Sequence, residues 1–168
     1  MNMKNKLLIS ILFFIVLFTS CNEGLAPAGP VPKSYLKGLI TYVGGKDKWT
    51  KDSVYAIRVA AFKNYPFLDT NNIMLEILSG QAYFTLEPLP KRVDTAGFSL
   101  EIPDSPREIK YIGVAMQYDS SLFSQRVIGI YTETGDRTKP SAIFIEKGKS
   151  AFVNIIVNWD SLPPQPIK

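Results

Sequence analysis

The sequence predicts an all-β domain, a β-sandwich of seven to eight strands, from three observations. First, apolar and polar residues alternate with a period of two along several short stretches, the pattern of half-buried strands. Second, turn-forming pairs such as Gly44–Gly45, Pro103–Asp104 and Gly135–Asp136 separate these stretches. Third, the chain has 168 residues, of which 46% are apolar, so it is large enough for one domain with a buried core.

Each predicted strand has a face that is mainly apolar. In 54–62, for example, Tyr55, Ile57, Val59 and Ala61 share one parity, whereas Arg58 has the other. Side chains of the same parity lie on the same face of a strand, so each stretch offers one face to a core. In chain order, the predicted strands are 36–43, 54–62, 82–86, 98–102, 110–118, 127–131, 142–146 and 151–159.

Two strands are expected at the centre of a sheet. Residues 111–118 and 126–131 are apolar at both parities apart from their polar ends, which indicates cover on both faces. Gly113 and Gly129 within them favour the close approach of another segment.

Two further expectations concern strand pairing. The tight turn 146–149 predicts a hairpin between 141–145 and 150–158. We also consider strand 36–43 as an exposed edge that a partner protein would pair with.

One short helix is predicted in the region 71–80, where the strand pattern is interrupted. Asn71–Asn72 is the expected N-terminal cap, the helix covers 73–79, and Gly80 ends it. The same letters also permit a strand, so both interpretations stay open at this point.

The N-terminal residues have the features of a targeting segment. Lys4 and Lys6 precede an apolar run over 7–18, followed by Thr19–Ser20 and then Cys21, which is the chain's single cysteine. A run of about 12 apolar residues is shorter than the roughly 20 that span a membrane, and it suits a secretory signal. The arrangement resembles a bacterial lipoprotein signal, which implies cleavage before Cys21 and a lipid on its thiol. The alternative is an ordinary secretory signal with a free or buried cysteine.

These features divide the chain into four parts. Residues 1–20 are the predicted signal peptide, and 21–33 are the lipidated cysteine with a tether rich in proline and glycine. Residues 34–161 form the sandwich domain, and 162–168 are an irregular tail with three prolines. We therefore expect the protein at the bacterial cell envelope, attached to the membrane and facing either the periplasm or the outside.

Composition excludes several classes of function. The chain has no histidine, which rules out Ser/His/Asp and Cys/His catalysis and histidine-ligated metals. One cysteine rules out an intrachain disulfide or a cysteine-rich metal centre. Removing Lys4 and Lys6 leaves 17 basic against 15 acidic residues, and this small excess of +2 gives no reason to expect a nucleic acid partner.

Candidate catalytic and metal-binding patterns are weak. The carboxylates are scattered over predicted turns, and Asp69, Asn71 and Asn72 lack the spacing of a calcium loop. No G-x-S-x-G, P-loop or G-x-G-x-x-G motif occurs. We therefore expect no metal, no cofactor and no enzymatic activity.

Loop aromatics are the candidate ligand-contact residues. Trp49 lies between lysines in the loop 44–52, and Tyr65 and Phe67 flank Pro66 in the next long loop. Such rings stack on sugars or anchor a partner protein when exposed. The alternative, which we favour, is that they fold over the open ends of the sandwich as part of the core.

The strand pattern resembles the small transthyretin-like (carboxypeptidase-regulatory-like) β-sandwiches of bacterial envelope lipoproteins. The resembling stretches are 37–42, 53–62, 98–102 with 111–115, and 148–159, whereas 64–96 departs from the pattern. The resemblance implies a transthyretin-like or immunoglobulin-like sandwich and a non-catalytic role. It transfers no site residues.

The leading hypothesis is a lipid-anchored, non-catalytic envelope protein whose sandwich is a binding or structural module. Its expected partners are the membrane and an envelope protein or polysaccharide. The alternatives are a glycan-binding accessory lipoprotein that uses loop aromatics and a small hydrolase that uses two carboxylates.

Overall fold

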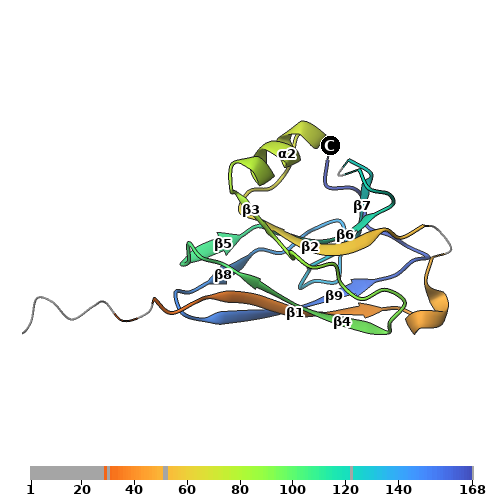
Figure 1. Ribbon diagram of the computed structural model, residues 1–168, viewed down its shortest axis with the longest axis horizontal. Helices are drawn as coiled ribbons and strands as arrows, with labels where there is room; N and C mark the ends of the chain where they lie inside the picture. Colours follow the sequence, from red (N-terminus) through yellow and green to blue (C-terminus); the bar gives the residue numbers. More distant parts are fainter. Residues whose placement is uncertain (1–28, 30, 51–52, 122, 168) are drawn as a thin grey trace, which may run out of the picture. The chain divides into compact units, whose positions relative to one another are not determined.

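Two β-sheets packed face to face form the body of the domain, which confirms the predicted all-β sandwich (Figure 1). The computed structural model describes residues 29, 31–50, 53–121 and 123–167. The first sheet has the order β4-β1-β9, the second has β3-β2-β6-β7, and β5 pairs with β8. The elements are β1 Tyr35–Tyr42, η1 Gly45–Lys48, β2 Ala56–Phe62, α2 Thr70–Leu78, β3 Ala82–Phe84, β4 Thr95–Glu101, β5 Arg107–Ile109, β6 Tyr111–Gln117, β7 Gln125–Ile130, β8 Ile143–Ile145 and β9 Ser150–Val157.

The core lies between the two sheets and follows the predicted alternation. In β1 and β4 every second residue is buried, and in β9 the same holds for Val153, Ile155 and Val157. In β2 the residues Ile57, Val59 and Ala61 face the core. Strands that place apolar residues at alternate positions bury them all on one face, so the two sheets close over a continuous apolar layer.

Gly38 allows the first sheet to accommodate a large ring. It pairs with Phe98 on β4 and with Val153 on β9. A Cβ atom at Gly38 would lie 2.5 Å from both a Phe98 ring carbon and the Val153 carbonyl oxygen. The Phe98 ring therefore occupies the space that a side chain at position 38 would need.

Strand β6 is central as predicted, but the prediction for β7 is wrong. β6 lies between β2 and β7, whereas β7 is at the edge of the second sheet. The C-terminal tail lies along this edge, where the Gln165 side chain accepts a bond from Val127 N at 2.9 Å and donates one to Val127 O at 3.2 Å. A side-chain amide thus partly replaces the missing neighbouring strand.

The predicted hairpin between 141–145 and 150–158 is also wrong. The turn exists, with Gly148 at φ +73°, but β8 pairs with β5 and β9 pairs with β1 in parallel. The turn therefore connects two sheets instead of two neighbouring strands. Because β9 and β4 flank β1, the expectation of an exposed edge at 36–43 is wrong as well.

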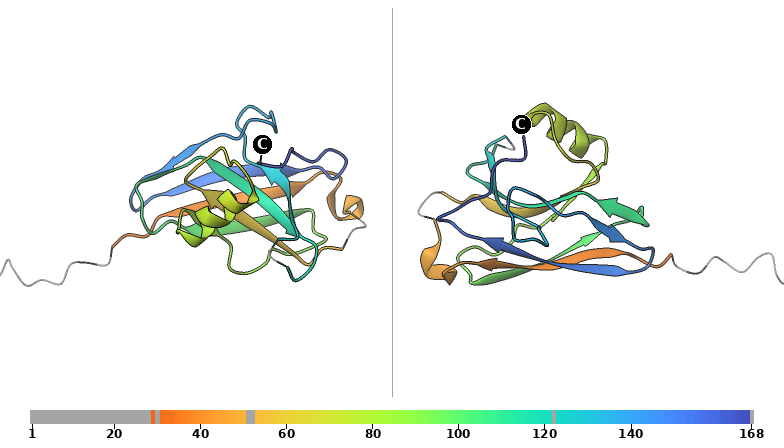
Figure 2. Two further views of the ribbon diagram at one scale, coloured as in Figure 1. Left: turned by 90° about the horizontal axis from the view of Figure 1, so that it is seen from above. Right: turned by 180° about the vertical axis from the view of Figure 1, so that it is seen from behind.

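Helix α2 confirms the helical interpretation of the 71–80 region, but its N-terminal cap differs from the prediction. Asp69 is the cap, and its Oδ1 accepts a hydrogen bond from Asn72 N at 2.8 Å. The helix therefore begins at Thr70, before Asn71–Asn72. Gly80 follows its C-terminus at φ +70°, as expected for a residue that ends a helix. Figure 2 shows α2 lying on the outer side of the second sheet, close to the C-terminus.

Ser34 joins three segments at the start of β1. Its buried hydroxyl donates to Glu146 O at 3.1 Å, and it accepts bonds from Ser105 Oγ at 2.6 Å and Gly148 N at 2.7 Å. The hydroxyl thereby holds the β8–β9 turn against the first strand.

We expect Ser34→Ala to lower the free energy of unfolding by about 1–3 kcal/mol, because it removes the bonds of a buried hydroxyl and leaves the partly buried Gly148 N–H without its acceptor. Urea denaturation followed by circular dichroism measures the change. Ser105→Ala is the control: it removes one of the three bonds, so its loss should be smaller. A Ser34→Ala protein as stable as the parent would contradict this role.

Candidate functional site

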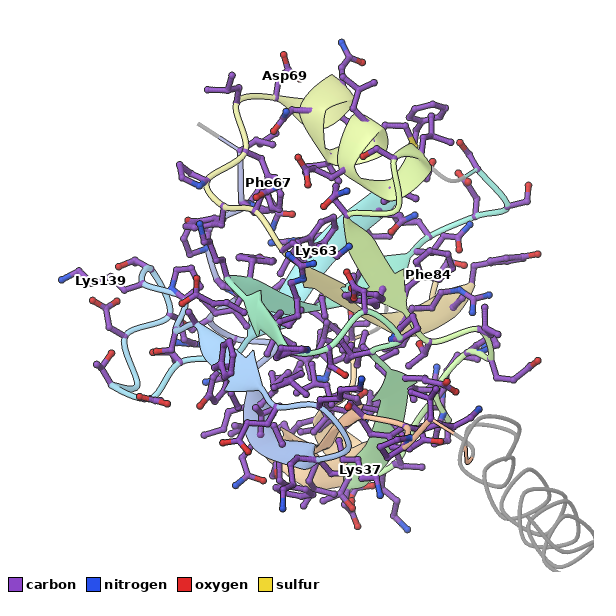
Figure 3. All side chains as sticks on the ribbon, turned by 90° about the vertical axis from the view of Figure 1, so that its left-hand side faces the viewer. Lys37, Lys63, Phe67, Asp69, Phe84 and Lys139 are labelled. Carbon is purple, nitrogen blue, oxygen red and sulfur yellow. The ribbon has the colours of Figure 1, made fainter. Side chains whose placement is uncertain are left out.

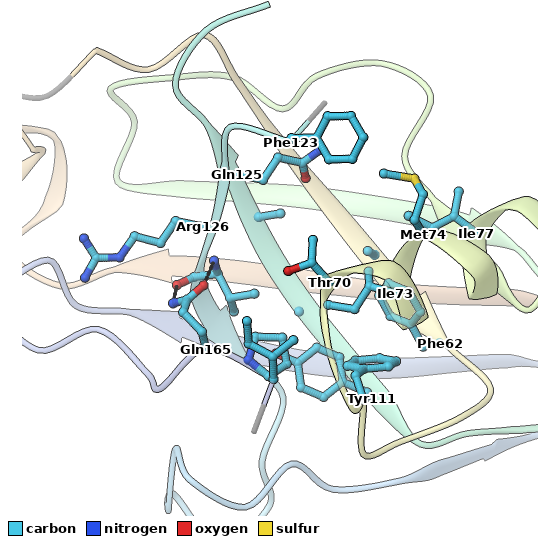
Figure 4. A pocket seen from close by; sticks show the side chains of 17 residues that line it. Phe62, Thr70, Ile73, Met74, Ile77, Tyr111, Phe123, Gln125, Arg126 and Gln165 are labelled. Atoms are coloured by element: carbon cyan, nitrogen blue, oxygen red, sulfur yellow. Dashed lines mark hydrogen bonds between the residues drawn. The ribbon is translucent and has the colours of Figure 1, made fainter. Parts of the chain in front are cut away.

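A cavity of about 260 Å³ lies between the outer face of the second sheet, helix α2 and the C-terminal tail (Figure 4). Segments far apart in the sequence therefore meet there: strands β2, β6 and β7 below, the helix on one side, and residues 165–167 on another. The cavity is separate from the core between the two sheets.

Small residues on the outer face of the sheet form the floor of the cavity. Ala60 on β2 pairs with Gly113 on β6, and Ala115 on β6 pairs with Val127 on β7. All four line the cavity. Larger side chains at 60, 113 and 115 would fill the space under the helix, so these three positions determine that a cavity exists.

One face of α2 forms a wall of the cavity. Thr70, Ile73, Met74 and Ile77 line it, with the i, i+3, i+4, i+7 spacing of a single helical face. The Asp69 cap fixes where the helix begins and therefore which residues face the sheet. The wall is apolar except for the Thr70 hydroxyl.

The C-terminal tail closes another side. Gln165 is held by its two hydrogen bonds to Val127, and Ile167 forms a parallel bridge with Phe67. At the opposite end of the cavity Phe123, which is 72% exposed, lies near Met74 (Figure 4). Residues 162–167 lie outside the named helices and strands and belong to the same compact unit as the sandwich.

A cluster of aromatic rings holds Tyr111 at the floor. Its ring is stacked on Tyr65 with centroids 5.1 Å apart, and it meets Phe67 and Phe62 edge-on at 5.6 and 6.2 Å. Tyr111 is 3% exposed, and its Oη has no hydrogen-bond partner among the described residues. Burial, with a smaller contribution from Tyr65, raises the pKa of the Tyr111 hydroxyl far above its usual range, so the group is neutral at physiological pH.

The structure brings together two of the three aromatic residues proposed as ligand contacts. Phe67 lines the cavity, and Tyr65 supports Tyr111 from the side. Trp49 instead belongs to the core between the sheets: it is 8% exposed, packs 4.6 Å from Tyr42 and 5.4 Å from Trp159, and donates from Nε1 to Val93 O at 2.9 Å. Cys21, the proposed lipidation site, lies outside the described residues.

Sequence reasoning did not identify Tyr111, Ala60, Gly113 or Ala115 as site residues. One feature of the sequence pointed to this site. Residues 111–118 are apolar at both parities, which implies that another segment covers the outer face of this strand. The sequence does not specify what provides that cover.

A polar network lies beside the helix, on the side of β3. Lys63 Nζ is 2.8 Å from Asp104 Oδ2 and 2.9 Å from Gly80 O, and its charge lies over the Tyr83 ring at 5.2 Å (Figure 3). Tyr83 donates its hydroxyl proton to Asp104, and Arg107 is 3.3 Å from the same carboxylate. Partial burial acts to raise the pKa of Asp104, but the bonds from Lys63 and Tyr83 and the charges of Lys63 and Arg107 together lower it.

We expect this carboxylate to contribute acid-sensitive stability. A folded-state pKa below the unfolded value of about 4 stabilises the fold above that value, and the contribution is lost as the pH falls through the folded pKa. Asp104→Asn should therefore cost up to about 1 kcal/mol at pH 7, since the group is partly exposed, and almost nothing near pH 2. Denaturation at the two pH values measures this, with the exposed Glu108→Gln as control. An equal cost at both would contradict the ion-pair origin.

A second hollow, of about 690 Å³, lies where β3 and the loop after it face β4. Phe84 and Leu86 are exposed beside it. The Tyr83 hydroxyl at this hollow donates its hydrogen bond to Asp104. It therefore differs from the Tyr111 hydroxyl of the first cavity, which has no hydrogen-bond partner among the described residues.

Acidic groups and metals have no evident role at the cavity. Among the described residues that line it, none is acidic. Within the same described ranges, no three histidine, cysteine, aspartate or glutamate residues gather where a metal ion would be held. Nor does this part of the chain contain a helix with the length and apolar character needed to cross a bilayer.

Comparison with protein-family models, with curated proteins and with solved structures gives no match for this chain.

Proposed function

We propose that the protein is a lipid-anchored, non-catalytic component of the bacterial cell envelope whose sandwich binds a small, mainly apolar molecule. The observation that carries the binding role is the cavity between α2 and the second sheet. The anchoring role rests on the sequence pattern that places Cys21 directly after the signal-like segment.

The size and lining of the cavity support binding. Ligand sites are concave and mainly apolar, with a few polar groups that fix orientation. This cavity, at about 260 Å³, exceeds the roughly 150 Å³ cavity that is known to hold benzene. Its walls are aliphatic and aromatic, and its polar groups include Thr70, Tyr111 and Gln165.

The same lining favours an apolar ligand over a glycan. A sugar carries many hydroxyl groups, and each one buried without a partner costs free energy. The apolar walls of this cavity offer few such partners, and Trp49, the ring best suited to stacking on a sugar, is in the core. We therefore place the polysaccharide alternative second, and the partner we propose besides the membrane is a small molecule.

The proposed anchor suits such a role. Several acyl chains on one cysteine give stable membrane attachment, and the segment after it contains three prolines and two glycines within 22–33. Such a composition acts as a spacer, which would hold the sandwich near the membrane, where apolar molecules concentrate.

Ligand recovery tests the proposal. The full chain is purified from the cells that express it, washed and extracted with organic solvent, and the extract is analysed by mass spectrometry. We expect a stoichiometric small molecule from the parent protein. Ala115→Leu, which places a larger side chain on the cavity floor, should lose it, because the added atoms occupy the ligand's space.

Ala142→Leu is the matched control, since Ala142 is exposed and is not among the residues lining the cavity. It should retain the molecule. Equal recovery from Ala115→Leu and the parent, or no molecule from any of the three in the extracts and no thermal stabilisation by added apolar compounds, would overturn the proposed binding role.

A further inference from the structure

The Tyr111 hydroxyl is a buried polar group without a partner among the described residues, in a mainly apolar site. Its atom is inaccessible to water, and no described residue hydrogen-bonds to it. Buried polar groups in native proteins are nearly always paired, so each exception needs an explanation such as a bound molecule.

The position of the hydroxyl is fixed by its surroundings. A Cβ atom at Gly113 would lie 2.9 Å from Tyr111 Cε1 and 3.4 Å from Oη. The ring therefore leans along β6 over a residue that itself lines the cavity. The stacking on Tyr65 and the edge contacts with Phe62 and Phe67 hold it there. The hydroxyl thus lies beside the floor formed by Ala60, Gly113 and Ala115.

The lining also constrains the charge of a ligand. Among the described lining residues Arg126 is the charged one, and Figure 4 shows its side chain extending away from the space between Thr70 and Gln165. A charged group inside would lose its hydration without gaining an ion pair. A neutral group that accepts or donates one hydrogen bond avoids that cost.

We propose that the cavity selects a neutral, compact, apolar molecule that carries one hydroxyl or carbonyl group, and that this group pairs with Tyr111 Oη. This inference rests on the proposed binding function and names its ligand class. Because Oη is now covered, binding includes a small adjustment of the surrounding side chains, and the flexible Met74 at the wall is suited to it.

A set of matched compounds tests the inference. Affinities of 4-propylphenol, propylbenzene and 4-propylbenzoate are measured by isothermal titration calorimetry on the full chain, purified in detergent. Ala115→Leu is titrated in the same detergent, so that partitioning into micelles is common to both and is subtracted. We expect the phenol to bind about threefold to tenfold more tightly than the hydrocarbon, the gain typical of one hydrogen bond, and the benzoate to bind most weakly.

Tyr111→Phe identifies the group responsible. It removes one oxygen atom and keeps the ring, so it should still bind propylbenzene while its preference for the phenol disappears. An equal affinity of the parent for phenol and hydrocarbon, a preference that survives in Tyr111→Phe, or tightest binding of the benzoate would each overturn the inference but leave the binding function standing. Failure of all three compounds to bind the parent above the Ala115→Leu level would overturn both.

Discussion

Trp49→Ala is expected to lower the free energy of unfolding by about 3–5 kcal/mol, the usual cost of removing a large ring from a core. The Trp49 ring is 8% exposed, and its loss would leave Tyr42 and Trp159 facing a cavity. It would also remove the donor to Val93 O, which holds the segment before β4 against η1. Chemical denaturation followed by circular dichroism measures the effect.

Two control variants test whether the loss of stability comes from the buried ring of Trp49. Trp49→Phe keeps an aromatic ring but not the donor, so it should recover much of the stability. Phe123→Ala removes an aromatic ring that is 72% exposed, and its cost should stay within about 0.5 kcal/mol. A Trp49→Ala protein with the stability of the parent would contradict the core role of Trp49. Trp49 would then again be a candidate ligand-contact residue, as proposed from the sequence.

Cys21→Ala has the second large expected effect, a complete change of location. The proposed anchor requires the Cys21 thiol for acylation, and the apolar run 7–18 is shorter than a membrane span. We expect the protein to move from the membrane fraction to the soluble fraction. Mass spectrometry of the N-terminal peptide should show an acylated residue 21 in the parent and none in the variant.

Ser20→Ala is the matched control for this change. It keeps a small residue before the cysteine, so lipidation and membrane attachment should persist. A parent protein whose mature N-terminus has an unmodified Cys21, or a Cys21→Ala protein that stays with the membrane, would refute the anchor. Neither outcome would bear on the cavity, so the two parts of the proposed function are tested separately.

The sequence predicted the faces of the strands better than their neighbours. Alternation grouped Phe98, Leu100 and Ile102 on one face of their strand. It likewise grouped Val153, Ile155 and Val157 on one face of the last strand. All six side chains are buried. Periodicity reports which side of a strand meets a core, but it carries no information on which strand lies alongside. The predicted β8–β9 hairpin and the β1 edge were wrong for that reason.

The candidate site depended on information that the sequence does not display. The wall residues Ile73, Met74 and Ile77 lie within the helix that the sequence predicted over 73–79. The floor consists of small residues, which are not distinctive in a strand. Whether Tyr111 Oη finds a partner depends on the three-dimensional arrangement of groups distant in sequence. Trp49 and Phe67 look alike as loop aromatics, yet one belongs to the core and the other to the cavity.

The parallel pairing of β1 with β9 has a consequence for the order in which the domain is completed. Strand β1 can pair with β4 earlier, but it gains its second neighbour, β9, only after Ser150–Val157 has left the ribosome. Pairing of segments more than a hundred residues apart is slow, because a long loop must close first. The nascent chain therefore remains without its finished first sheet until Val157 has been synthesised, and an unfinished chain is the form in which a polypeptide can be threaded through a narrow channel.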